Sequence, residues 1–262
     1  MFLKKSRFIF MIVLTTASFL MITVPAALSS SYYIYDDFGG TWHDVNKNWV
    51  GDSNMCWAAA ASNILDWGSW HTPFYPAHQE IFDNFKYHWT NEGGMMDYGW
   101  DWWLNGTNPP DWTGWSQVDG GGNHWPEYEF SDYYNEEWER DLAMSTIDEY
   151  LHSGYGTTLA IYSGLSGHAL TCWGYEYDDK KGYTDIWVTD SDDDVIELVK
   201  CSVSWNKGKN WWTLGDAYNG YHIGGVEGLA ATPEPVSSIL FVIGGASLVF
   251  FRYRRRKRIC KK

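Results

Sequence analysis

Cys56, His168 and Asp190 are the residues of this chain whose types and order could support nucleophilic chemistry. Cys56 follows Asp52-Ser53-Asn54 and lies in an alanine-rich segment that predicts a capped helix over 54–67. In the first turn of a helix the macrodipole and the unpaired backbone N–H groups favour negative charge, so the pKa of the thiol should fall. A thiolate there is a nucleophile, and its own N–H could hold an oxyanion. Alternatively, Cys56 is a small buried hydrophobe, as many free cysteines are.

A predicted β-hairpin brings His168 and Asp190 together. His168 opens one strand, Asp190 closes the next, and their midpoint is residue 179, inside the turn Asp178-Asp179-Lys180-Lys181-Gly182. Antiparallel pairing then places them opposite one another, within about a residue of register and with Cβ atoms about 5 Å apart. Such a carboxylate can orient an imidazole and stabilise its protonated form. Each residue could instead be structural, but the upstream cysteine favours a catalytic interpretation.

The elements that must position these residues change in type along the chain. Helices are expected first, over 54–67, 76–89 and Asn135–Ser153, with long Gly-, Pro- and Trp-rich loops from Gly93 to Pro126. Strands follow at Thr157–Tyr162, Gly167–Tyr177 and Tyr183–Thr189, and near Val195–Val203 and Tyr221–Leu229. Helices followed by a sheet predict an α+β domain.

Both ends of the 262-residue chain are predicted to be targeting segments rather than parts of the folded domain. Residues 1–31 have a charged start, an apolar stretch and small residues at Ala27-Leu28-Ser29, as in a secretory signal peptide, although a permanent anchor is the alternative. Residues 232–262 contain Pro233-Glu234-Pro235, an apolar run over 236–251 and an arginine-rich cluster. The run is just under the usual length of a tilted membrane helix, and the basic cluster should stay cytoplasmic.

This tripartite tail resembles the PEP-CTERM sorting signal of Gram-negative bacteria. The resemblance implies recognition by an exosortase, cleavage near the Pro-Glu-Pro motif, and an exported protein that the inner membrane holds transiently through residues 236–251. The remaining domain, 32–231, has eight basic residues against 32 acidic ones, a net charge of −24. That charge opposes binding to nucleic acid or anionic lipid.

Cysteine and histidine spacing predicts no metal site and no cofactor. The chain has no Cys-x-x-Cys and no His-Glu-x-x-His, and the acidic run from Asp190 lacks the glycine and the glutamate of a calcium loop. Outside the tail, the cysteines are Cys56, Cys172 and Cys201. An odd number of exported cysteines suggests one disulfide and one free thiol, so Cys172 and Cys201 form either a disulfide or two reduced core thiols.

Three segments resemble the IdeS/Mac cysteine endopeptidases, a papain-like family: Lys47 to Ala60, Gly167 to Gly174 and Trp187 to Asp192. The likeness runs from about residue 42 to 229. It implies a papain-like cysteine peptidase fold, in which an N-terminal helix carries the nucleophile and packs on an antiparallel sheet that carries the histidine and the aspartate. No feature of the sequence singles out immunoglobulin, the substrate known for that family.

The resemblance assigns a role to each matching residue. It implies that Cys56 is the nucleophile, His168 the base and Asp190 the orienting acid. Asp192 matches a second acid near the site, and Lys47 matches a lysine of the oxyanion hole. Lys47 precedes Cys56 by nine positions, about one fewer than in the family, and could instead be a solvated surface lysine.

The sequence therefore predicts a cysteine-type endopeptidase that acts on a protein or peptide without a cofactor. A bacteriocin-leader-type peptidase is a neighbouring alternative, but that group usually has a glutamine ahead of the cysteine. An alternative of another class is an inactive surface module of peptidase-like fold that binds exopolysaccharide or peptide. Its binding surface would be the Trp-rich stretch, which could equally be packing for a Gly-rich segment: Trp100, Trp102, Trp103, Trp112, Trp115 and Trp125.

Overall fold

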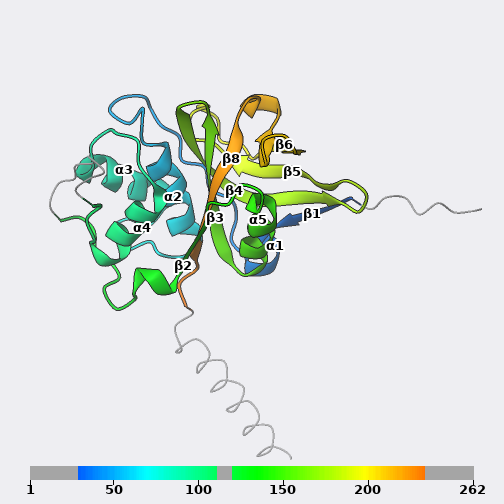
Figure 1. The fold of residues 1–262 in the computed structure, drawn as a ribbon. Helices are drawn as coiled ribbons and strands as arrows, with labels where there is room; N and C mark the ends of the chain where they lie inside the picture. Colours follow the sequence, from blue (N-terminus) through cyan, green and yellow to red (C-terminus); the bar gives the residue numbers. More distant parts are fainter. Residues whose placement is uncertain (1–28, 111–119, 234–262) are drawn as a thin grey trace, which may run out of the picture.

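The computed structural model describes residues 29–110 and 120–233, and it shows an α+β protein whose helices pack against a closed antiparallel barrel (Figure 1). Six strands form the barrel in the order β4-β3-β8-β7-β6-β5, and β5 pairs back onto β4 to close it. Their bounds are β3 Tyr155–Ser163, β4 Ser166–Asp178, β5 Gly182–Thr189, β6 Val199–Asn206, β7 Trp211–Leu214 and β8 His222–Ala230. Two further strands extend it: β1 (Ser29–Tyr33) pairs with β4, and β2 (Tyr134–Glu137) pairs with β8.

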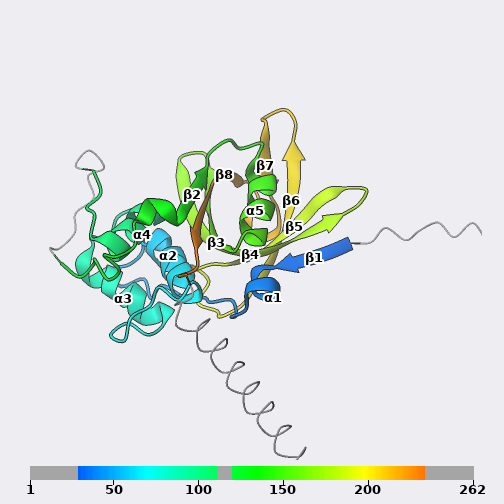
Figure 2. The ribbon, with the colours of Figure 1, turned by 90° about the horizontal axis from the view of Figure 1, so that it is seen from below.

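Helices α2 (Cys56–Trp67), α3 (His78–His88) and α4 (Met96–Asn105) form a layer beside the barrel, as the view from below also shows (Figure 2). Helix α2 lies in the middle, between strands β3 and β4 and the other two helices. Its alanines 58–61 are all buried, because small side chains let a helix pack closely on several sides. Helix α5 (Ala143–His152) packs on β3 and β8, and the short α1 (Ile34–Phe38) follows β1.

Two of the three predicted helices are confirmed, and the third is only partly correct. Helices α2 and α3 lie within two residues of the predicted bounds. The helix expected over Asn135–Ser153 begins only at Ala143, because residues 134–137 add a strand to the edge of β8. Sheet pairing there overrides local propensity, and the buried positions of a helical face begin only with Ala143 and Met144.

The predicted strands are confirmed, although one is displaced. β6 starts at Val199 rather than near Val195, and both Val195 and Ile196 are exposed before it. The short elements β1, α1 and β7 were not predicted.

The expectation of continuous loops between Gly93 and Pro126 is wrong, because Met96–Asn105 forms helix α4. Its apolar face is aromatic rather than aliphatic, with Trp100, Trp102 and Trp103 buried. Gly99 lies where this helix crosses Trp57, and a Cβ there would approach the indole within 2.8 Å. A glycine in mid-helix therefore permits close packing instead of ending the helix.

The predicted signal peptide and sorting tail lie almost wholly outside the described residues, so the boundaries at 31 and 232 stay predictions. Strand β1 begins at Ser29, inside the predicted cleavage region. None of the helices within the described ranges has the length and apolar composition needed to cross a bilayer.

Candidate active site

Cys56 lies in the first turn of α2, as predicted, and is its first residue, but the predicted side-chain cap is absent. The N-cap position is Met55, which provides no capping oxygen. The Asp52 carboxylate instead accepts the N–H of Asn48 at 3.1 Å and lies 3.2 Å from the Lys86 ammonium. Without a capping side chain, the first-turn N–H groups beside the thiol keep their partial positive charge, which favours a thiolate.

His168 and Asp190 meet through the β4–β5 hairpin. The Nε2 atom of His168 lies 2.7 Å from Oδ1 of Asp190, and both side chains are largely buried. Thr171 pairs with Thr189, which centres this end of the hairpin on residue 180 rather than 179. Continued pairing would place Asp190 across from residue 170, so the two side chains meet diagonally rather than face to face. The predicted contact is present, with a small shift in register.

Cys56 and His168 line the same cleft, and their side chains are close enough for each to shift the pKa of the other. Because Nε2 of the imidazole is engaged with Asp190, Nδ1 is the nitrogen left for the sulfur. Burial by itself would raise the pKa of the Cys56 thiol, but the hydrogen bond and charge of His168 lower it, helped by the Ala169 N–H and the charge of Lys47. Burial likewise opposes protonation of His168, yet its bonds to Asp190 and Cys56 raise its pKa to about 10. Both shifts favour transfer of the proton from sulfur to imidazole.

Asp190 is held by more than the imidazole. Its Oδ2 accepts a hydrogen bond from the hydroxyl of Tyr218 at 2.9 Å, and its Oδ1 accepts the N–H of Asp192 at 3.0 Å. Burial would raise the pKa of Asp190, but these donors and His168 keep it below its ordinary value. Tyr218 closes the 3-10 helix η3 (Asp216–Tyr218), between β7 and β8. Its role could not be predicted from the sequence, because one tyrosine among 18 with no motif around it carries no signal.

Lys47 and Asp192 form an ion pair next to this group. The side chain of Lys47 is only 1 % exposed, and its Nζ lies 2.5 Å from Oδ1 of Asp192 and donates to the carbonyl of Ser53 at 2.8 Å. It is therefore not a solvated surface lysine. The other Asp192 oxygen lies 3.9 Å from Nδ1 of His168. The five residues predicted for the site thus form one connected network.

The positive charges of this network take the place of a metal ion beside His168, Asp190 and Asp192. The ligand atoms of His168, Asp190 and Asp192 lie within 4.8 Å of one another, a spacing that could hold a metal ion. The ammonium of Lys47 already provides a positive charge on Asp192, and His168 gains a proton readily.

Buried hydrogen bonds fix the helix that carries the thiol to the sheet that carries the imidazole. Asn63 of α2 donates to the Thr171 hydroxyl of β4 at 3.0 Å and accepts the N–H of Val45 at 3.0 Å. The indole of Trp173 donates to Thr189 at 3.0 Å, which joins β4 to the end of β5. These bonds stand beside the candidate catalytic residues and were not foreseen from the sequence.

A cleft of about 230 Å³ opens beside the thiol. One wall is the loop that leads into α4, and the other is formed by β3 and β4. Gly94 lies against the Trp57 ring, where a Cβ would approach within 2.6 Å. The lining residues are Cys56, Gly93, Gly94, Met95, Met96, Ala160, Tyr162, Gly167, His168 and Ala169.

Cys172 and Cys201 differ sharply from Cys56. Both are buried free thiols, so of the two alternatives the structure has the pair of reduced core thiols rather than a disulfide. Burial raises the pKa of Cys172 to about 12 and that of Cys201 to about 11. Among the described cysteines, only Cys56 has a lowered pKa.

The described part of the Trp-rich stretch is packing rather than an exposed binding surface. Trp100, Trp102 and Trp103 are buried, and Trp125 packs against the core. The indoles of Trp103 and Trp125 both donate to the carbonyl of Trp70, at 2.8 and 2.9 Å. Two further members of the predicted stretch, residues 112 and 115, lie outside the described residues.

No protein-family model matches this chain, and no curated protein matches it. Any functional assignment therefore depends on the chemistry of the site itself.

Proposed function

We propose that this chain is an exported cysteine endopeptidase of papain-like fold, which hydrolyses peptide bonds through Cys56, His168 and Asp190. The observation that carries the proposal is the thiol at the start of α2, beside an imidazole that lowers its pKa and whose Nε2 lies 2.7 Å from a buried carboxylate. A nucleophile, a base and a group that orients the base are the parts that covalent acyl transfer needs. The resemblance to the IdeS/Mac peptidases agrees with the same residues.

In the proposed reaction, His168 takes the proton of Cys56, and the thiolate attacks the carbonyl carbon of the scissile bond. The C–S bond forms, and the negative charge moves to the carbonyl oxygen, where the N–H of Cys56 stabilises it. Protonated His168 then gives its proton to the leaving amine, which leaves a thioacyl-enzyme. Water, deprotonated by His168, hydrolyses this intermediate and regenerates the thiol.

Lys47 has an indirect part in this proposal. Its ammonium is bonded to Asp192 and to the carbonyl of Ser53, so a direct hydrogen bond to the oxyanion would require one of those bonds to be exchanged. Its positive charge still lowers the pKa of Cys56. We therefore assign Lys47 to electrostatic support of the thiolate and Asp192 to holding Lys47 in place.

The cleft favours an extended peptide over a bulky ligand. A side chain at Gly93 would enter open space, so its absence lets a substrate main chain pass close to that wall beside Cys56. The predicted signal peptide and sorting tail place the reaction outside the cytoplasm, after transient anchoring in the inner membrane and exosortase processing.

Alkylation of Cys56 provides the direct test. We expect iodoacetamide to modify Cys56 selectively, with half of its maximal rate reached below the ordinary thiol pKa of 9.0, because the thiolate fraction rises through a lowered pKa. Loss of the His168 proton near pH 10 leaves the sulfur as a thiolate, so the alkylation rate should not fall there. Rates are measured by mass spectrometry of the full chain over a pH series.

The buried thiols are internal controls for this experiment. Cys172 and Cys201 should react only after denaturation, because both are buried and have raised pKa values. Casein and a peptide library are then incubated with the wild type and with Cys56→Ala. A slow Cys56, together with equal residual cleavage by both proteins, would reject the peptidase and favour the inactive binding module.

Tyr218→Phe tests whether Asp190 depends on its hydroxyl donor. Removing this hydrogen bond of 2.9 Å leaves one buried carboxylate oxygen without its partner, so the His168–Asp190 pair should lose orientation. We expect kcat/KM to fall at least about tenfold, in line with about 1.5–3 kcal/mol for a hydrogen bond to a charged group, with KM nearly unchanged. Tyr177→Phe, on the exposed end of β4, is the control. Equal kinetics for the two variants would remove Tyr218 from the site.

A further inference from the structure

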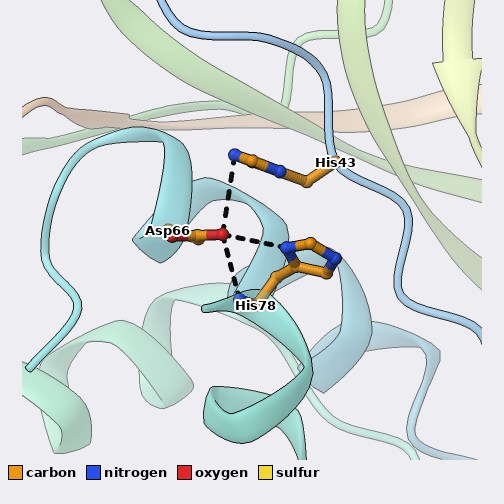
Figure 3. Close-up of side chains that lie close together, drawn as sticks. All are labelled: His43, Asp66 and His78. Atoms are coloured by element: carbon orange, nitrogen blue, oxygen red, sulfur yellow. Dashed lines mark hydrogen bonds and ion pairs between the residues drawn. The ribbon is translucent and has the colours of Figure 1, made fainter. Parts of the chain in front are cut away.

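A second cluster of polar side chains lies at the other end of α2. Asp66 is ten residues from Cys56, about 15 Å along the helix axis. His43 and His78 point at its carboxylate from the chain before α2 and from the first residue of α3 (Figure 3). His71 approaches from the connection between the two helices. Three imidazoles around one carboxylate are a ligand set typical of zinc.

The distances are close to those that an ion would require. His43 Nε2 lies 3.6 Å and His78 Nδ1 lies 2.8 Å from Asp66 Oδ2, and the three ligand atoms fall within 4.8 Å of one another. Ligands bound tetrahedrally at 2.0–2.1 Å from a metal stand about 3.3 Å apart. The Nδ1 atom of His71 lies 3.4 Å from the other carboxylate oxygen. Although the ring is half-exposed, this nitrogen is buried and has no hydrogen bond in the described structure. His71 lies outside this group of three, so its half-exposed ring would have to move to join them on one ion.

The surroundings hold these ligands in place. The backbone N–H of His78 donates to the Asp66 oxygen at 3.0 Å, which orients the carboxylate. The carbonyl of His43 accepts the Thr189 hydroxyl at 2.9 Å, and its ring contacts Trp173 edge-on. These contacts fix the backbone of His43 and the carboxylate of Asp66, so the ligand atoms face one another before any ion binds. The chain has 33 acidic and 19 basic residues, and its net negative charge would also attract a cation.

We propose that His43, Asp66 and His78 bind one divalent transition-metal ion of the zinc class, with His71 as the fourth ligand. Four protein ligands would make a closed, structural site that ties the chain before α2 to helices α2 and α3. The sequence predicted no metal site because short motifs of closely spaced ligands are absent. The ligands proposed now are instead spread over residues 43–78. The inference is independent of the proposed peptidase activity.

Zinc binding to the full chain, kept in solution with detergent, tests the proposal. Cys56→Ala serves as the parent, because the reactive thiol could bind zinc itself. We expect one Zn²⁺ per chain by equilibrium dialysis and metal analysis, and Co²⁺ should give the intense visible bands of tetrahedral coordination. Asp66→Asn and His78→Gln should each weaken zinc binding more than about 100-fold, beyond the loss typical of an outer-shell change.

Two controls assign the ion to this cluster. His152→Gln breaks another His–Asp pair, at 2.9 Å on the exposed face of α5, and should leave zinc binding unchanged. His168→Gln removes the other group with metal-like spacing and should also leave it unchanged. Absence of binding in the parent, equal binding by Asp66→Asn and His78→Gln, or loss only with His168→Gln would overturn the proposal. If Asp66→Asn does not fold, His71→Gln, at a half-exposed position, should still lower the affinity at least tenfold, and an unchanged affinity would count against the site.

Discussion

His168→Asn is expected to lower kcat/KM for peptide hydrolysis by at least about 10³-fold, as when a member of a catalytic triad is removed. The amide cannot accept the Cys56 proton, and the pKa of the thiol should rise because the imidazole that lowers it has gone. Both the attack and the protonation of the leaving amine are lost together. Steady-state cleavage of a fluorogenic peptide measures the effect, and the alkylation rate at neutral pH should fall with it.

His152→Asn makes the same chemical change far from the thiol, at an exposed position on α5, and should keep full activity. The double variant of Cys56→Ala and His168→Asn should be no worse than either single variant, since the two residues act as a unit. Activity of His168→Asn within tenfold of the wild type would show that the imidazole is not the base.

Trp103→Ala is expected to lower the free energy of unfolding by about 3–5 kcal/mol, the usual cost of removing a large aromatic side chain from a core. Trp103 is fully buried in α4, where its ring contacts Tyr75, Phe85 and His124. The carbonyl of Trp70 would still be bonded by the Trp125 indole at 2.9 Å, so the loss comes mainly from the cavity. Urea unfolding followed by circular dichroism measures it.

Trp205→Ala provides the comparison, because Trp205 is 40 % exposed on β6 and leaves little cavity. We expect this variant to lose less than about 1 kcal/mol. Similar losses for the two tryptophans would mean that α4 is not part of the core, and would reopen the question of whether its tryptophans bind a ligand.

Much of the candidate site could be predicted because its signals are local. The alanine-rich segment after Cys56 predicts a buried helix, and the turn at 178–182 fixes the hairpin closely enough to join His168 with Asp190. Both inferences use only helix and hairpin geometry, which short sequence windows determine.

The remaining features depend on contacts between distant segments. Tyr218 reaches Asp190 only because β7 and β8 close the barrel. Helix α4 was missed because its glycine and tryptophans resemble a loop until Trp57 is placed beside them. β2 is a strand only because β8 offers it an edge. Tertiary packing determines these contacts, and local sequence patterns carry little information about it.

The division of the site between two layers has a consequence for the life of the protein. Cys56 belongs to the helices and His168 to the barrel, and Asn63 bonded to Thr171 is part of what holds them together. A newly made chain whose layers have not yet docked would carry an ordinary, unreactive thiol. Under the proposed function, such a chain would not cleave other proteins. Peptidase activity would begin only when the helical layer docks on the barrel.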